Sequence, residues 1–107
     1  MAHLARYTGG DAALNAEVFE LFVGQATELM CQLEGVIRSG DTSRWRQVTH
    51  TVKGAARGIG AFGLADAAAD AEPIDPAIDA EHAAQALRQI HAQAETVRLF
   101  IEAYLGR

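Results

Sequence analysis

The stretch Arg44-Trp-Arg-Gln-Val-Thr-His-Thr-Val-Lys-Gly-Ala-Ala-Arg-Gly-Ile-Gly60 decides the fold of this chain. Read at helical period, it has one apolar stripe, formed by Trp45, Val48, Val52, Ala55 or Ala56, and Ile59. His50 lies two residues from Val48 and two from Val52, which is roughly 200° around the helix from either. The imidazole of His50 is therefore predicted to face solvent.

The same solvent side carries cations and a residue without a side chain. Arg46, Lys53 and Arg57 lie one turn before, one turn after and two turns after His50. Gly54 is one turn from the histidine, although a glycine inside a helix costs roughly 1 kcal/mol relative to alanine. We interpret this glycine as exposing the imidazole to the surface of another protein. The alternative is that it permits close helix packing.

These residues resemble the signature of histidine-containing phosphotransfer (HPt) domains. That family has a histidine, a lysine three residues later, a glycine four later and a second glycine ten later, followed by leucine and small residues on the next helix. The matching positions are His50, Lys53, Gly54, Gly60, Leu64, Ala68 and Glu72. The core of the resemblance spans residues 45–72, and the flanking helices extend it over most of the chain.

The resemblance implies a role for each residue near His50. The Nε2 nitrogen of His50 would be phosphorylated, and Lys53 would balance the charge of the phosphoryl oxygens. Glu72 is the candidate acceptor for the Nδ1 proton, because the family often has glutamine or glutamate at that position. The candidate partner-binding residues are Arg46, Gly54, Arg57, Gly58 and Ala61.

Composition narrows the class of protein. The 107 residues suit one domain, residues 1–107, with a single modest core. The net charge of −5 argues against nucleic acid as a partner, and no apolar run is long enough to span a membrane. The single cysteine, Cys31, is expected to pack as a small hydrophobe and fits a reducing, cytoplasmic location.

The apolar periodicity predicts an all-α chain, folded as an antiparallel up-down-up-down four-helix bundle after a short N-terminal lead-in. The expected helices cover approximately residues 11–39, 42–60, 62–72 and 76–105. Asp11 is the expected cap of the first helix, and Asp41 or Thr42 that of the second. Pro76 is expected at the first position of the last helix.

The predicted function is that of a phosphorelay intermediate without ATP-dependent kinase activity, because the sequence has no nucleotide-binding loop. The resemblance implies two kinds of partner, the receiver domain of a response regulator and a sensor or hybrid histidine kinase. It assigns no cofactor to this chain and expects Mg²⁺ on the receiver only. A monomer is expected.

Two other classes of function compete with this prediction. A helical adaptor could dock an acidic partner through the basic patch without any chemistry. A metal-binding bundle could use His50, Glu72, His82 and His91. Di-iron bundles, however, use Glu-x-x-His pairs, and none of the four histidines has a glutamate three residues before it.

Overall fold

The computed structural model describes residues 12–106, which form four α-helices and contain no β-strand. The helices are α2 (Ala12–Ser39), α3 (Thr42–Gly58), α4 (Phe62–Ala71) and α5 (Ala80–Tyr104). The prediction of an all-helical chain is confirmed. Asp11, the expected cap of the first helix, and the N-terminal lead-in lie outside the described residues.

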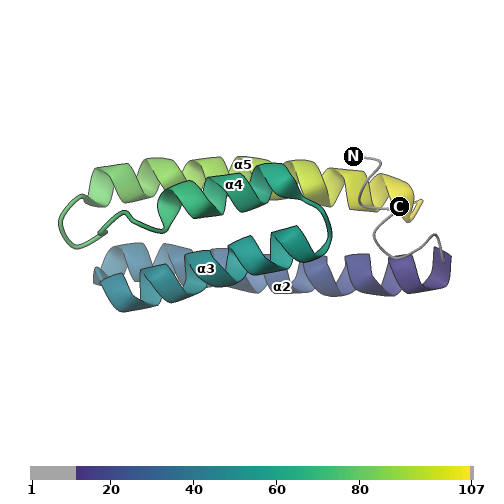
Figure 1. Cartoon of the computed structure of the whole chain (residues 1–107), viewed down its shortest axis with the longest axis horizontal. Helices are drawn as coiled ribbons and strands as arrows, with labels where there is room; N and C mark the ends of the chain where they lie inside the picture. The colour runs from purple at the N-terminus through teal and green to yellow at the C-terminus, as the bar shows by residue number, and fades with distance from the viewer. Residues whose placement is uncertain (1–11, 107) are drawn as a thin grey trace.

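Each helix packs against two neighbours, so that the bundle has four sides. Helix α2 contacts α3 and α5, and α4 also contacts α3 and α5. Figure 1 shows α3 and α4 nearer the viewer, with α2 and α5 behind them. The edge where α3 meets α4 is therefore opposite the edge where α2 meets α5.

The apolar stripes of all four helices meet in one core. Trp45, Phe19, Leu33, Ile90 and Ile101 are among the fully buried side chains. Helix α4 contributes mostly small residues, with Leu64, Ala65, Ala68 and Ala71 buried. Small side chains allow helix axes to come close, so α4 can lie tightly against α3.

The indole of Trp45 ties the start of α3 to the end of α4. Its ring is fully buried, and its Nε1–H donates a hydrogen bond of 2.9 Å to the carbonyl oxygen of Ala71. That carbonyl belongs to the last turn of α4, where helical carbonyls lack a partner within their own helix. The same carbonyl also accepts a hydrogen bond of 3.1 Å from the Ile74 N–H. The bond from the indole therefore satisfies the buried Nε1–H and gives the Ala71 carbonyl a second donor.

The second helix ends earlier than residue 60. Gly60 has φ of +78°, and the N–H groups of Gly60 and Ala61 donate to the carbonyls of Arg57 and Ala56. This is a Schellman motif, which requires a residue in the left-handed region just after the helix. Gly60 therefore stops α3, and Ile59 is the capping residue.

The last helix begins at Ala80, four residues later than the expected start at Pro76. The carboxylate of Asp75 accepts hydrogen bonds from the Ala77 N–H and, at 2.5 Å, from the Thr42 hydroxyl. These contacts hold the segment after Asp75 in turns, as short polar side chains often do. Asp79 instead caps the helix, because its carboxylate accepts from the His82 N–H.

Cys31 also differs from its expectation. The sequence predicts that it packs as a small hydrophobe, but it is exposed on α2. The neighbouring residue Met30 occupies the buried position at this turn. One residue of rotation, about 100°, separates the two and decides which side chain is inside.

The buried indole gives a first prediction. We expect Trp45→Phe to lower the free energy of unfolding by about 1–3 kcal/mol, because the Ala71 carbonyl would lose one of its two donors and the smaller ring would leave buried space unfilled. Urea unfolding followed by circular dichroism would measure the change. Leu21→Ala, at a side chain that is 75 % exposed, is the control and should change stability by less than about 0.5 kcal/mol. Equal unfolding midpoints for Trp45→Phe and the wild type would contradict the role given to the indole.

Candidate functional site at the α3–α4 edge

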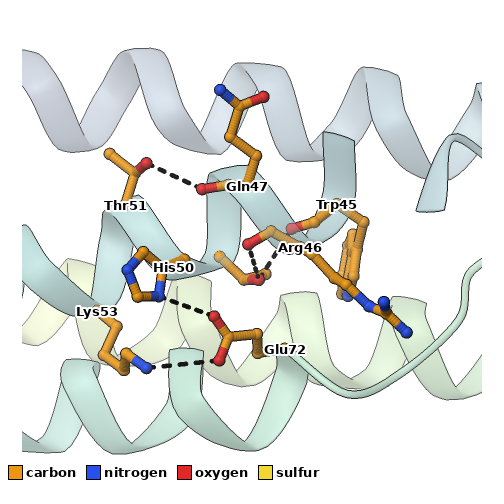
Figure 2. A network of polar contacts seen from close by, with 8 residues as sticks. Trp45, Arg46, Gln47, His50, Thr51, Lys53 and Glu72 are labelled. Carbon is orange, nitrogen blue, oxygen red and sulfur yellow. Dashed lines mark hydrogen bonds and ion pairs between the residues drawn. The ribbon is translucent and has the colours of Figure 1, made fainter. Parts of the chain in front are cut away.

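His50 projects from the outer side of α3. Its side chain is 69 % exposed, whereas Val48, Thr49 and Val52 beside it in sequence are buried. The ring leans toward α4, and its Nδ1 lies 2.9 Å from Oε1 of Glu72 (Figure 2). The other ring nitrogen, Nε2, points away from Glu72. One side of the imidazole is thus held by the protein while the other faces outward.

Glu72 accepts from two residues of α3 at once. It is the C-terminal capping residue of α4, and its second oxygen, Oε2, lies 3.4 Å from Nζ of Lys53. The Lys53 side chain is only 18 % exposed, so most of its stem lies along the protein surface. A single carboxylate therefore connects the imidazole and the ammonium group (Figure 2).

These contacts change the acidity of Glu72. Partial desolvation raises the pKa of the carboxyl group, but the hydrogen bonds and charges of His50 and Lys53 outweigh it. The net result is a pKa below the ordinary value of 4.5. At neutral pH the group is therefore an ionised acceptor.

An ionised acceptor at Nδ1 favours one tautomer of the ring. A neutral imidazole carries one proton, and a carboxylate at hydrogen-bonding distance favours the tautomer with that proton on Nδ1. The Nε2 lone pair is then directed outward. The arrangement is suited to attack on an electrophile that approaches from solvent.

The other predicted site residues are distributed differently. The Arg46 side chain points away from the imidazole (Figure 2), and its charge contributes to lowering the pKa of Asp75, after the hydrogen bond from Thr42 and backbone hydrogen bonds. Arg57 is exposed. Gly54 and Gly58 are exposed, and a Cβ added at either would have no atom within 4 Å. Close helix packing therefore does not explain these two glycines.

Ala61 requires a correction. It is only 2 % exposed, because its side chain points into the core at the start of α4, and it leaves no surface for a partner. The next residue, Phe62, is 55 % exposed and was not singled out from the sequence. The pattern contains the signal, since Ala61, Leu64, Ala65 and Ala68 define the inner side of α4 and leave Phe62 outside it.

The remaining histidines in the described part of the chain lie elsewhere. His82 is 3.7 Å from Asp79, and His91 is 3.2 Å from Glu34 on α2. Within residues 12–106 no group of three or more His, Cys, Asp and Glu side chains is placed to hold a metal ion. Across the same residues, no helix has the length and apolar character needed to cross a membrane.

Comparison with protein families identifies the chain. The family described as Hpt domain matches residues 17–100, which is most of the sequence. The chain belongs to the Hpt domain family. Neither the curated proteins nor the solved structures gave a match. Hpt domains serve histidine phosphotransfer in phosphorelays, together with receiver domains and histidine kinases, and they are carriers of the phosphoryl group.

The lowered pKa of Glu72 predicts how this Hpt domain responds to acid. Because the pKa of Glu72 is lower in the folded state, the unfolded state binds a proton at this carboxyl group at a higher pH than the folded state does. The free energy of unfolding therefore falls as the pH falls below the ordinary carboxyl pKa. Glu72→Gln should remove this part of the decrease below about pH 5. Urea unfolding between about pH 3 and pH 6 would measure it.

Glu17→Gln is the matched control, because Glu17 is an exposed glutamate on α2. The control should keep the steeper acid dependence of the wild type. If Glu72→Gln and the wild type lost stability in parallel as the pH fell, the ionised role of Glu72 would be contradicted.

Proposed function

We propose that His50 accepts a phosphoryl group at Nε2 and passes it on as a phosphorelay intermediate. The donor is the aspartyl phosphate of a receiver domain, or a sensor or hybrid histidine kinase, and the acceptor is a response regulator. The observation that carries the proposal is the exposed imidazole, held through Nδ1 at 2.9 Å from Glu72. Membership of the Hpt domain family supports the same chemistry.

The tautomer with its proton on Nδ1 determines how the phosphoryl group is transferred. The Nε2 lone pair forms the N–P bond while the P–O bond to the receiver's aspartate breaks, and the bonding electrons leave with that carboxylate. The ring becomes cationic, and its Nδ1 proton is stabilised by the carboxylate of Glu72. Onward transfer is the reverse reaction with a second receiver, whose aspartate oxygen attacks phosphorus while Nε2 leaves as neutral imidazole.

Lys53 supplies charge beside the incoming group. Its Nζ lies 3.4 Å from Glu72, a distance at the long end for a hydrogen bond, so the ammonium group can turn toward phosphoryl oxygens at small cost. Glu72 would keep its contact with Nδ1 during this exchange. We assign Mg²⁺ to the receiver, whose acidic site it would occupy, and no cofactor to this chain.

The short connections between the helices bear on their relative directions. We infer an antiparallel up-down-up-down bundle in a single domain, because the connections from Ser39 to Thr42 and from Gly58 to Phe62 are too short for a return crossing. The order of colours along the helices in Figure 1 supports this direction. We take the protein to act as a monomer in the cytoplasm, where its partners would be found.

Replacing the histidine tests the proposed function directly. The wild-type protein, incubated with a panel of phosphorylated receivers and hybrid kinases, should acquire a label that is lost in acid and kept in base. His50→Gln should acquire none. His91→Gln is the matched control, because His91 is also exposed and lies 3.2 Å from a glutamate.

The control should be labelled as the wild type is. A label that persists in His50→Gln would show that another residue is phosphorylated. No label on the wild type from any donor would favour the adaptor function instead, and partner signalling that survives His50→Gln would establish it.

Removing the orienting carboxylate gives a further prediction. Glu72→Ala should lower the rate constant of transfer from bound receiver by at least about tenfold, because the cationic ring would lose the ionised acceptor of its Nδ1 proton. Glu72→Gln keeps a carbonyl acceptor for Nδ1–H and should lose less. Single-turnover kinetics would measure the rates, and nitrogen-15 NMR of the ring would report the tautomer.

The matched control is Glu34→Ala, which removes the carboxylate beside His91 instead. It should leave both the transfer rate and the His50 tautomer unchanged. An unaltered tautomer in Glu72→Ala would show that Glu72 does not orient the ring, whatever the effect on rate.

A further inference from the structure

An open groove lies between α2 and α5, at the edge of the bundle opposite the one that carries His50. These two helices lie behind α3 and α4 in Figure 1. The groove has a volume of about 250 Å³, and its lining is mostly apolar. The apolar side chains that line it are Phe22, Val23, Ala26, Met30 and Ala94. Because two of these are alanines, the helices leave space between them at the surface.

The size and length of the groove indicate what could fill it. Sites for drug-sized ligands usually have volumes of about 300–1,000 Å³ and enclose most of the ligand, so this groove is small and open by comparison. Its wall on α2 extends from Phe22 to Glu34, which is about 18 Å or three helical turns. A partner helix could place apolar side chains from successive turns into a groove of that length.

Ionised groups line both ends of the groove. At one end, Nε2 of His91 on α5 lies 3.2 Å from Oε1 of Glu34 on α2. At the other end, Arg98 donates a hydrogen bond of 2.9 Å to Glu95 on the same helix. That hydrogen bond, the charge of Glu95 and the charge of Glu102 together raise the pKa of Arg98. The arginine of the lining is therefore surrounded by acidic groups.

The two helices that form the groove are acidic as a whole. The sequence of α2 contains four glutamates and one arginine, and that of α5 contains three glutamates and two arginines. Helix α3 has the opposite character, with four cations and no acidic residue. A basic partner would therefore be attracted to the α2–α5 groove, whereas an acidic one would be attracted to α3.

We propose that the α2–α5 groove binds an amphipathic helix of a partner protein, with apolar residues on one side and Lys or Arg on its flanks. The apolar residues would enter beside Val23, Ala26 and Ala94, and the cations would meet Glu34 and Glu95 at the rim. Since the groove is opposite the α3–α4 edge, this partner and a receiver domain can occupy one molecule at the same time. The inference goes beyond the proposed function, because no residue of the groove takes part in phosphoryl transfer.

A library of displayed helices tests the chemistry of the partner. The probes are helices of about four turns with apolar residues fixed on one side and all other positions randomised, selected on the 107-residue chain. Selection should enrich Lys and Arg at the flanks of the apolar side. A synthetic copy of one selected helix should then shift the amide NMR signals of Thr27 and Ala94 and leave that of His50 unchanged.

Substitutions in the groove test where the selected helix binds. Ala26→Gln places an amide in the apolar lining at a half-buried position, and Glu34→Lys reverses a charge at an exposed one. Each should raise the Kd of the selected helix about tenfold, measured by fluorescence anisotropy. Glu17→Lys is the matched control, because it makes the same change of charge at an exposed position of α2 outside the groove. The control should change Kd by less than about twofold.

Four results would overturn the inference. The first is a selection that enriches no helix, or enriches helices with acidic flanks. The second is an equal loss of affinity in Glu17→Lys and Glu34→Lys, which would show attraction to the net charge alone. The third is a set of NMR shifts centred on α3 and α4. The fourth is a wild-type protein that sediments as a dimer through α2 and α5, because a second copy would then occupy the groove.

Discussion

The hydrogen bond from the Trp45 indole to the Ala71 carbonyl fixes the geometry on which the site depends. It joins the first turns of α3 to the last turn of α4 inside the core. Glu72 follows Ala71 directly, so the anchored carbonyl also fixes where the Glu72 backbone lies. From there the carboxylate reaches the ring of His50, five residues after Trp45 on α3. A buried contact thus orients an exposed side chain, which rotates freely on most helix surfaces.

The carboxylate of Glu72 performs two tasks that differ in their electrostatic demands. Toward His50 it must remain an ionised acceptor, and the ammonium group of Lys53 helps to keep it so. The proposed turn of Lys53 toward phosphoryl oxygens requires a weak contact with Glu72, and 3.4 Å is at the long end for a hydrogen bond. A glutamine would retain an acceptor for Nδ1 but would not hold Lys53 by charge. The carboxylate of Glu72 keeps His50 and Lys53 close together, and its negative charge offsets the ammonium charge beside the ring.

Helical periodicity correctly predicted which sides of the helices face the core. It failed at positions where a single local contact determines the structure. The inward stripe containing Trp45, Val48 and Val52 follows from spacing, and so does the outward direction of His50. The start of α5 does not, because the Asp75 carboxylate holds turns where a proline alone would permit a helix. The exposure of single residues beside an apolar stripe was also assigned wrongly. One residue of rotation separates the buried Ala61 from the exposed Phe62, and likewise Met30 from Cys31. Knowing which neighbour covers each position requires the packed helices.

The α3–α4 edge carries positive charge, whereas the chain as a whole is negative. The sequence of α3 contains Arg44, Arg46, Lys53 and Arg57 and no acidic residue, although the whole chain carries −5. Three of these cations interact within the chain: Arg44 with Gln32, Arg46 with the charge of Asp75, and Lys53 with Glu72. Arg57 is exposed and forms no ion pair within residues 12–106, so its charge is available to a partner. An acidic receiver would therefore be attracted to this edge and repelled by the rest of the surface, an effect that added salt screens over about 10 Å.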